Sequence, residues 1–440
     1  MGCCASTPEP PSITVIGKDS SGNTIATVEA ETYYSVGTLK SMIESRLRLN
    51  RDELYIDITY EGNLLRNPDA LGKVLRCDEP TSPPIVLITT MPAPGRIPHG
   101  VELPEKKPPG GSGGMWSGIA ESGGRLFLAP HHADCVLVID PAAGTTSTIS
   151  IGVEGRAKWS GIAACAGRLY CAPYDAGEVL VIDPSTNTTS TIECSRTFCD
   201  FGRQGDVIRE QSRKWSGAVA SGGRVYCAPV LSGFHEVLVI DPSTDTCSTI
   251  PIVSESGRRW IKWARIAECG GRLLCPPEDT SLESHELAAG HEMLSIDPAT
   301  QTARTRPVRG LPERVKFGGI AAFDGRLFCV SERKIVAIDP ATGDASTIAE
   351  LNSGDNDVWQ GVTEFGGRLY CPPCVGREVL VIDPVAGTTS KIPLGATWGY
   401  GLSSGLSKWS SAASCGGRLY FNPDYEADVL VITPPAVPTD

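Results

Sequence analysis

From Trp116 onward the sequence repeats one unit seven times, and this repeat constrains the fold more than any other feature. Each unit reads approximately K-W-S-G-I-A, then G-G-R-L-Y-C-A-P, then V-L-V-I-D-P-x-T, and finally S-T-I. The opening aromatic residues are Trp116, Trp159, Trp215, Trp263, Phe317, Trp359 and Trp409. Units of about 40–55 residues, each with four short strands, are typical of propeller blades. We therefore predict a mainly β protein in which residues 115–440 form a seven-bladed β-propeller.

Two turn signals recur along the repeat and delimit its strands. Gly-Gly or Ala-Gly before an arginine predicts a tight hairpin turn, because glycine tolerates positive φ. Asp-Pro predicts a type I turn in which the aspartate side chain accepts backbone N–H groups. The turn arginines are Arg125, Arg168, Arg224, Arg272, Arg326, Arg368 and Arg418. The aspartates before proline are Asp140, Asp183, Asp241, Asp297, Asp339 and Asp383, and Thr433 takes this place in the seventh unit.

The repeated arginines and tryptophans each allow a structural and a functional interpretation. We expect each arginine to pair with an aspartate of the I-D-P step or with a backbone carbonyl, and an anion-binding channel is the alternative. We expect the tryptophans to pack between blades, and a ligand cage is the alternative.

The V-I-D-P-x-T pattern resembles that of the bacterial lyase-like and surface-layer seven-bladed propellers. The resemblance to the lyase-like propellers implies a magnesium site built from histidines and a glutamate. His235, His285, His291 and Glu286 lie in adjacent units and could converge on such a site. The resemblance does not match these residues position by position. A metal-dependent propeller lyase or hydrolase is therefore the alternative function.

Differences in length between the units indicate a partner-binding surface on one face. The insertions join blades at 194–213, 251–261, 306–315 and 393–407, or join a second to a third strand at 276–291. In an up-and-down meander these two loop types lie on the same face, and loops on a rigid scaffold often carry function. The five histidines of the repeat are expected in second-to-third-strand loops there: His131, His132, His235, His285 and His291. We predict that they contact a protein partner together with Glu286, and simple solvation of these histidines is the alternative.

The seventh unit is incomplete, because it has no S-T-I strand after Ile432. The stretch before the first unit, residues 91–114, is rich in proline and glycine and predicts a linker. Within it, His99–Leu103 stands about as far before Trp116 as the outer strands stand before later opening aromatics. We predict that His99–Leu103 crosses over to complete the seventh blade, since a closed ring has no exposed sheet edge.

Residues 12–90 predict a small α+β domain. We expect strands at 12–17, 24–30, 54–60, 64–65 and 84–89, and a helix with Leu39, Met42, Ile43 and Leu47 on one face. This order, with the Y-E-G-N-L-L run at 60–65, resembles ubiquitin, which implies a docking module. Polar Thr59 stands where ubiquitin carries part of an apolar recognition patch, so binding by ordinary ubiquitin receptors is not expected. A generic β-grasp domain without a ubiquitin-related role is the alternative.

The tail of residues 1–11 resembles that of dual-acylated proteins. Gly2 lies in the pattern M-G-x-x-x-[ST] and predicts N-myristoylation after removal of Met1. One myristoyl chain holds a membrane only weakly, so a second signal is required. Cys3 and Cys4 supply it as palmitoylation sites. We therefore expect the protein on the cytoplasmic face of a membrane in a eukaryotic cell.

Charge and cysteine usage narrow the function class further. A formal net charge of −12 argues against a nucleic-acid partner. Of the 16 cysteines, several share one repeat position, as Cys171 and Cys227 do, and would lie too far apart to pair. The C-x-x-C of Cys371 and Cys374 has neither a following helix nor a second pair, so we expect no redox or zinc role there. With no nucleophile elbow or phosphate loop, we expect a scaffold that binds proteins and needs no catalytic residue, metal, cofactor or small-molecule substrate.

The proposed anchor can be tested by mutation. Gly2→Ala should move the protein from the membrane to the soluble fraction, because losing the myristoyl chain also prevents the palmitoylation that follows it. Cys3→Ser with Cys4→Ser should leave weak, reversible binding, with a partition constant of roughly 10⁴ M⁻¹ for one chain. Cell fractionation measures both effects, and a wild-type protein that is wholly soluble in its own cells would contradict the prediction.

Overall fold

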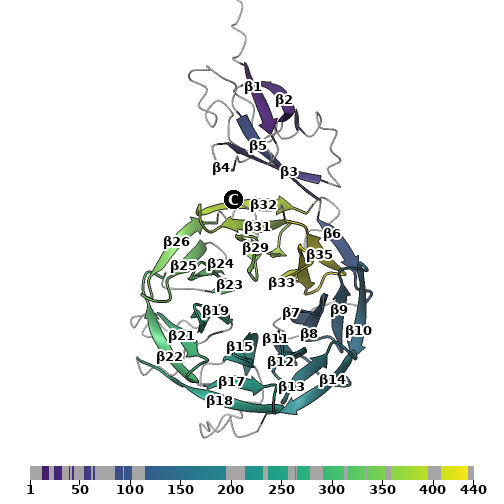
Figure 1. The fold of residues 1–440 in the computed structure, drawn as a ribbon, viewed down its shortest axis with the longest axis vertical. Coiled ribbons are helices and arrows are strands. Elements are labelled where there is room, and N and C mark those ends of the chain that lie inside the picture. Colours follow the sequence, from purple (N-terminus) through teal and green to yellow (C-terminus); the bar gives the residue numbers. More distant parts are fainter. Residues whose placement is uncertain are drawn as a thin grey trace, which may run out of the picture. The chain divides into compact units, whose positions relative to one another are not determined.

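The computed structural model of the protein divides into two units, Met1–Pro94 with Ile432–Asp440, and Gly95–Val431 (Figure 1). The structure describes residues 12–18, 24–31, 39, 42–43, 54–60, 63–64, 85–92, 94–101, 114–194, 214–230, 236–255, 263, 265–277, 291–311, 316–331, 334–351, 358–394 and 408–434. The predicted lipidation sites Gly2, Cys3 and Cys4 lie outside these residues.

The first unit holds a five-stranded mixed sheet in the order β2-β1-β5-β3-β4. Its strands are β1 (Ser12–Lys18), β2 (Thr24–Glu31), β3 (Leu54–Tyr60), β4 (Asn63–Leu64) and β5 (Ile85–Pro92). β5 runs parallel to β1 and antiparallel to β3. Leu39 and Ile43 are helical and buried, as their spacing of one helical turn predicts. The last strand beside the first at the sheet centre is the β-grasp arrangement, so the expected fold class of this unit is confirmed.

The second unit is a ring of seven blades, which confirms the propeller (Figure 1). The strands of blades 1 to 3 are β7 (Trp116–Ser122), β8 (Arg125–Pro130), β9 (Cys135–Asp140), β10 (Thr145–Ser150), β11 (Trp159–Cys165), β12 (Arg168–Pro173), β13 (Glu178–Asp183), β14 (Thr188–Glu193), β15 (Trp215–Ser221), β16 (Arg224–Pro229), β17 (Glu236–Asp241) and β18 (Thr246–Val253). Those of blades 4 and 5 are β19 (Ala267–Cys269), β20 (Arg272–Cys275), β21 (His291–Asp297), β22 (Thr302–Val308), β23 (Phe317–Phe323), β24 (Arg326–Ser331), β25 (Lys334–Ile338) and β26 (Ala345–Glu350). Those of blades 6 and 7 are β27 (Val358–Trp359), β28 (Thr363–Phe365), β29 (Arg368–Cys371), β30 (Pro373–Val375), β31 (Glu378–Asp383), β32 (Thr388–Pro393), β33 (Trp409–Cys415), β34 (Arg418–Pro423), β35 (Asp428–Ile432) and β6 (Gly95–Pro98).

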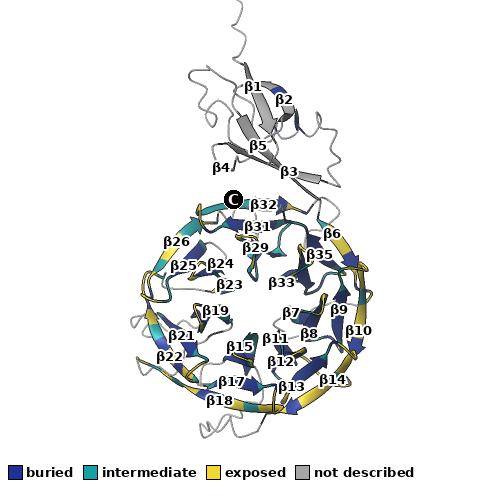
Figure 2. Cartoon of the chain, in the orientation of Figure 1, coloured by how far each residue is buried: buried dark blue, intermediate teal, exposed yellow. Residues whose placement is uncertain are grey.

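Burial follows the position of each strand within its blade. The second and third strands are buried along nearly their whole length, whereas outer strands such as β10 and β14 are mostly exposed, with one buried residue each (Figure 2). Both faces of the middle strands lie against neighbouring blades, which is why they read as continuous apolar runs. Phe127 of β8 packs in the cluster shared with blade 2, and its neighbour Leu126 packs in the cluster shared with blade 7. The core is therefore a series of inter-blade layers.

A buried tryptophan fastens six of the seven blades internally. The indole Nε1–H of Trp159 donates to the carbonyl of Glu178, the first residue of the third strand, at 2.8 Å. Equivalent bonds of 2.9–3.2 Å join Trp116 to Cys135, Trp215 to Glu236, Trp263 to Glu292, Trp359 to Glu378 and Trp409 to Asp428. Phe317 keeps the packing in blade 5 but has no N–H to donate. The tryptophan positions are thus sites of packing and strand attachment.

Ring closure uses a different strand from the one that the sequence predicted. β6 (Gly95–Pro98) supplies the fourth strand of the seventh blade and pairs antiparallel with β35, with Ile97 opposite Val429. The predicted strand His99–Leu103 was wrong: the described residues His99 to Val101 are not strand, although the His99 N–H still donates to the Ala427 carbonyl. β6 lies inside the stretch expected to be linker. The pattern of Gly95–Pro98 carries no alternation strong enough to reveal a strand without its partner β35.

Blades 3 and 4 are joined more closely than the repeat suggested. The outer strands β18 and β22 pair in parallel, with Ile252 opposite Ala303, so the two blades share one eight-stranded sheet. The insertions expected to begin at 251 and 306 therefore begin with strand: β18 continues to Val253 and β22 to Val308.

Closure can be tested through the two faces of β6. Ile97 is buried against Trp116 and Val429, so Ile97→Ala should destabilise the propeller by roughly 2 kcal/mol or more. Arg96 points outward and forms a partly exposed ion pair with Asp428, so the control Arg96→Ala should cost less than about 1 kcal/mol. Calorimetric unfolding of the full chain measures both. Equal effects of the two substitutions would contradict a closing role for β6.

Candidate partner-binding face

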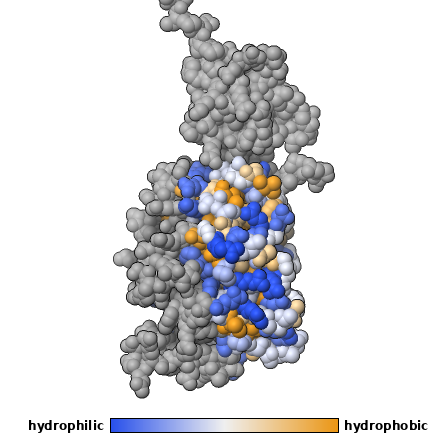
Figure 3. Space-filling view, turned by 90° about the vertical axis from the view of Figure 1, so that its left-hand side faces the viewer, coloured by the Kyte–Doolittle hydropathy of each residue, from blue (hydrophilic) through white to orange (hydrophobic). Residues whose placement is uncertain are grey.

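The two ends of the propeller ring differ in how the chain turns there. At one end lie the second-to-third-strand loops and the segments that join blades, for example 131–134 and 151–158; we call this end the loop face. At the other end, the turn face, lie the turns from first to second and from third to fourth strands. The outer wall between the two faces mixes hydrophilic and hydrophobic residues on the side shown in Figure 3.

The repeated aspartates shape the turn face. Asp140 Oδ1 accepts the backbone N–H groups of Ala142 and Ala143 at 3.0 Å. Asp183, Asp241, Asp297, Asp339 and Asp383 accept the N–H two residues on in the same way. Hydrogen bonds from Ser185 to the side chain of Asp183 lower the pKa of that carboxyl. These turns are short and alike, which leaves little on this face to distinguish one partner from another.

The turn arginines tie strands and blades together. Arg168 reaches Asp245 at 2.7 Å and the Pro242 carbonyl at 2.9 Å, both in the next blade. Arg125 makes the equivalent contacts with Asn187 and the Pro184 carbonyl. Arg224, Arg272 and Arg326 bond within their own blades, to Asp241, Asp297 and Ser346, and Arg368 and Arg418 occupy the same turn position at the starts of β29 and β34. The five arginines with these partners lie at the turn face as ties between strands or blades.

The loop face is held by the residue that precedes the tryptophan in four blades of the described structure. Lys214 donates its backbone N–H to the Tyr174 carbonyl of blade 2, and its own carbonyl accepts the Val230 N–H of blade 3. Met115, Lys158 and Lys408 bridge neighbouring blades by the same two backbone bonds. The buried ammonium groups of Lys158, Lys214 and Lys408 donate to the carbonyls of Gly155, Ala176 and Gly376 at 2.6–2.8 Å. Burial lowers the pKa of Lys158, and the Asp134 carboxylate opposes that shift. These bonds fix the backbone positions at which the loops of the loop face begin.

Two of the predicted partner-binding histidines belong to this framework. His131 is only 3% exposed, and its Nδ1–H donates to the Trp159 carbonyl at 2.8 Å. Its ring stands edge-on to His132 and Tyr174 at 4.7 and 5.3 Å between centroids. The half-buried His132 accepts the Ala157 N–H at its Nδ1. The prediction that His131 contacts a partner is wrong, because burial between blades 1 and 2 removes it from the surface.

The remaining predicted site residues are not brought together by the described structure. His291 was expected in a loop, but it opens strand β21 opposite Val308 of β22. His235, His285 and Glu286 lie outside the described residues. Within the described ranges, no group of three or more His, Cys, Asp or Glu side chains could hold a metal ion. Of the site that the lyase-like resemblance implied, only His291 is described, so its convergence with His235, His285 and Glu286 stays a prediction.

Polar side chains on the first strands of neighbouring blades bond to one another at the centre of the ring. Ser117, Ser160 and Ser216 follow successive tryptophans, and their hydroxyls form a chain with Oγ–Oγ distances of 3.1 and 2.9 Å. A Cβ on Gly161 would lie 2.6 Å from the Gly217 Cα, so adjacent blades approach too closely there for any side chain. Asn422, which replaces the usual alanine of the repeat, donates to the Trp116 carbonyl and to Ser410 Oγ. These hydroxyls and amides bond to one another across blade boundaries and bind the first strands together.

His99 is the loop-face histidine that sequence reasoning missed as a site residue. It is buried, its Nε2–H donates to the Glu426 carbonyl at 2.7 Å, and its Nδ1 accepts the Val101 N–H at 3.1 Å. This pair of bonds requires the neutral ring. Burial lowers the pKa of His99, while the Glu426 carbonyl and the Asp428 carboxylate oppose that shift. The ring stands edge-on to Trp116 at 5.1 Å, at the point where β6 closes the propeller.

No protein-family model and no curated protein matches this chain. Solved structures of similar fold include a catalytically inactive virginiamycin B lyase from Staphylococcus aureus with quinupristin, at 12% identity and a TM-score of 0.55, covering 76% of this chain and 99% of that chain. Hydrazine synthase of Kuenenia stuttgartiensis matches at 15% identity and a TM-score of 0.55, over 74% of this chain and 97% of that one. A streptogramin B lyase matches at 13% identity and 0.54, over 77% and 96%. Identities this low show the propeller fold alone. No helix among the described residues is long and apolar enough to span a membrane.

The state of His99 predicts acid sensitivity at the ring closure. Its pKa is lower in the folded protein than the ordinary value of 6.5, so the unfolded chain takes up the proton first as pH falls. The stabilisation is complete above about pH 6.5 and is lost as pH falls through the lowered pKa. As pH falls from about 7 to about 5.5, the melting temperature of wild type should fall more than that of His99→Gln. Burial raises the pKa of Glu426, which acts in the opposite sense at lower pH. Parallel melting curves for the two proteins would contradict the assignment.

Proposed function

We propose that this protein is a non-catalytic scaffold that a lipid-anchored N-terminus holds at the cytoplasmic face of a membrane. Its propeller binds a protein partner through the loop face, and its β-grasp unit docks a second protein. The observation that carries the proposal is the bridging residue before the tryptophan of four blades, as seen at Lys158 and Lys214. Buried lysine ends and paired backbone bonds give the loop face a rigid base, from which segments of unequal length leave.

A rigid face that carries loops of different length and sequence is suited to binding a large protein surface. Loops supply chemistry that differs from blade to blade, and the fixed base lowers the entropy lost on binding. On the segment that joins blades 1 and 2, Val153 is 37% exposed between a charged neighbour, Glu154, and a glycine. Val153 therefore lies at the surface of the loop face, where a partner can contact its side chain. The proposal that the protein is not an enzyme rests on the histidines predicted for a metal site. One histidine of the same face, His131, is buried and donates its ring N–H to the Trp159 carbonyl.

The lipid anchor and the docking role of the β-grasp unit are supported by the N-terminal part of the chain. The anchor rests on the acylation motif at Gly2, Cys3 and Cys4. For the β-grasp unit, the backbone register places Thr59 of β3 opposite Leu87 of β5. These are the third and last strands, on which ubiquitin carries its apolar recognition patch. A threonine at this point favours a partner other than the ordinary ubiquitin receptors.

Two matched valine substitutions test the loop face. Partners are first collected by proximity labelling with the full chain and its intact N-terminus, and binding of each purified partner is then measured. Val153→Glu on the loop face should weaken the propeller's partner by about tenfold or more, roughly 1.4 kcal/mol, because it buries a charge at the contact. Val385 is 82% exposed in the β31–β32 turn of the opposite face, so Val385→Glu introduces the same charge without effect on binding.

If Val385→Glu weakens binding and Val153→Glu does not, the partner binds the turn face, and this part of the proposal is overturned. The non-catalytic part fails if the purified protein holds a stoichiometric divalent metal that the triple change His235→Ala, His285→Ala and His291→Ala removes.

A further inference from the structure

Two cysteines meet where the chain leaves blade 2. Cys194 follows the outer strand β14, and Cys247 lies in β18, the outer strand of blade 3. Their Sγ atoms are 3.1 Å apart, although the residues are 53 positions apart in the chain. The two cysteines occupy different places in the repeat. They can therefore meet across a blade boundary, whereas cysteines at equivalent positions of two blades are too far apart. Both are free thiols in the structure.

The surroundings give the two thiols different roles. When Cys194 ionises, the Cys247 S–H donates to its thiolate, which lowers the pKa of Cys194 despite burial. The Val179 N–H and the Lys214 ammonium stabilise the same thiolate. The corresponding contact raises the pKa of Cys247. By contrast, burial alone raises the pKa of Cys171, which packs in the layer between blades 1 and 2. Cys194 is therefore the nucleophile of the pair, since the thiolate is the reactive form.

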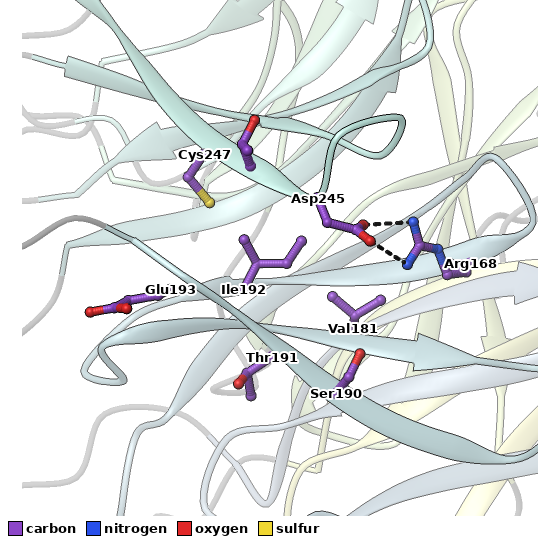
Figure 4. A pocket seen from close by; sticks show the side chains of 9 residues that line it. Arg168, Val181, Ser190, Thr191, Ile192, Glu193, Asp245 and Cys247 are labelled. Atoms are coloured by element: carbon purple, nitrogen blue, oxygen red, sulfur yellow. Dashed lines mark hydrogen bonds and ion pairs between the residues drawn. The ribbon is translucent and has the colours of Figure 1, made fainter.

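A cavity beside the pair is lined by one of its two cysteines, Cys247. It has a volume of about 360 Å³ and lies between blades 2 and 3, lined by residues of β13, β14 and β18. In Figure 4, Cys247 and Glu193 stand at one end and the Arg168–Asp245 ion pair at the other. Cys194 directly follows Glu193 in the chain. The cavity is partly open to solvent, so a low-molecular-weight disulfide can reach Cys247, whose Sγ lies 3.1 Å from that of Cys194.

We propose that Cys194 and Cys247 are a redox modification site that closes to a disulfide between blades 2 and 3 by exchange with a small disulfide such as oxidised glutathione. The Cys194 thiolate attacks one glutathione sulfur, forms a mixed disulfide and expels one glutathione thiolate. Cys247 then gives up its proton to solvent, attacks the Cys194 sulfur and expels the second glutathione thiolate. Two protein thiols lose two electrons and two protons, and one oxidised glutathione becomes two reduced molecules. The sulfurs need to approach by about 1 Å to reach a bond of about 2.05 Å.

Closure would join the outer strands of two blades and span the segment 195–213 that links them. It restricts the unfolded chain, so the oxidised propeller should melt at a higher temperature than the reduced one. The bond would form only when the surrounding thiol pool becomes oxidising, because a reducing compartment keeps the pair as thiols. The site thus gives the propeller a reversible cross-link that reports the redox state.

The test equilibrates the full-length purified protein in buffers of graded reduced and oxidised glutathione. Free thiols are then alkylated, and tryptic peptides are mapped by mass spectrometry. We expect a cross-linked peptide joining Cys194 to Cys247 that increases with oxidised glutathione and disappears with dithiothreitol, with a parallel rise in melting temperature. The matched control Cys165→Ser removes a half-buried thiol packed against the same inter-blade cluster and should leave the cross-link unchanged.

A second variant separates the two chemical steps and keeps the test decisive if one substitution harms folding. Cys247→Ala leaves Cys194 without a resolving thiol, so it should accumulate one glutathione on Cys194. Cys194→Ala should take up none at Cys247. The proposal is overturned if the folded wild type shows both thiols alkylated separately across the whole series. It is also overturned if wild type stops at a glutathione adduct, or if Cys194 pairs instead with another cysteine or a second chain.

Discussion

The propeller depends on one buried bond, made six times in the described ring, from the opening tryptophan of a blade to the start of its third strand. The indole N–H ties the innermost strand to one that is not its direct neighbour. The same ring packs against the preceding blade, as Trp159 does against Phe127 and Val138 of blade 1. One side chain therefore sets both the shape of a blade and its position on the next. Phe317 shows that packing is the shared requirement, since blade 5 keeps its place without the N–H.

Closure of the ring places a second constraint on the whole unit. A chain of blades has two free sheet edges, and here β6 and β35 remove them by pairing residues from opposite ends of the repeat. His99 sits at this junction with both ring nitrogens bonded, which links the closure to the protonation of one imidazole. Turn arginines such as Arg168 and bridging lysines such as Lys214 then fasten neighbouring blades on the two faces. The loops of the loop face thus begin from positions fixed by contacts on both sides.

Much of the candidate site could not be predicted, because it depends on contacts between different blades. His131 and His132 follow the same strand and look alike in the sequence, yet the Trp159 carbonyl of the next blade holds His131 in the interior. Cys194 and Cys247 belong to different repeat positions, so no internal spacing marks them as neighbours. Asn422 was the exception with a visible signal, since it replaces the alanine of the repeat and bonds across the junction of blades 7 and 1.

The sequence by itself determined the mainly β class, the number of blades, the turn chemistry of residues such as Asp140, and the order of the β-grasp strands. These features are local: each turn residue acts on its own backbone within a few positions, and the repeat period is written directly in the chain. Contacts between distant segments, which the folded chain alone reveals, make Gly95–Pro98 close the ring, pair β18 with β22 in parallel and bring Cys194 to Cys247. The physical reason is that edge pairing and burial are set by whichever distant segment lies alongside, and a short run such as β6 carries no pattern that names its partner.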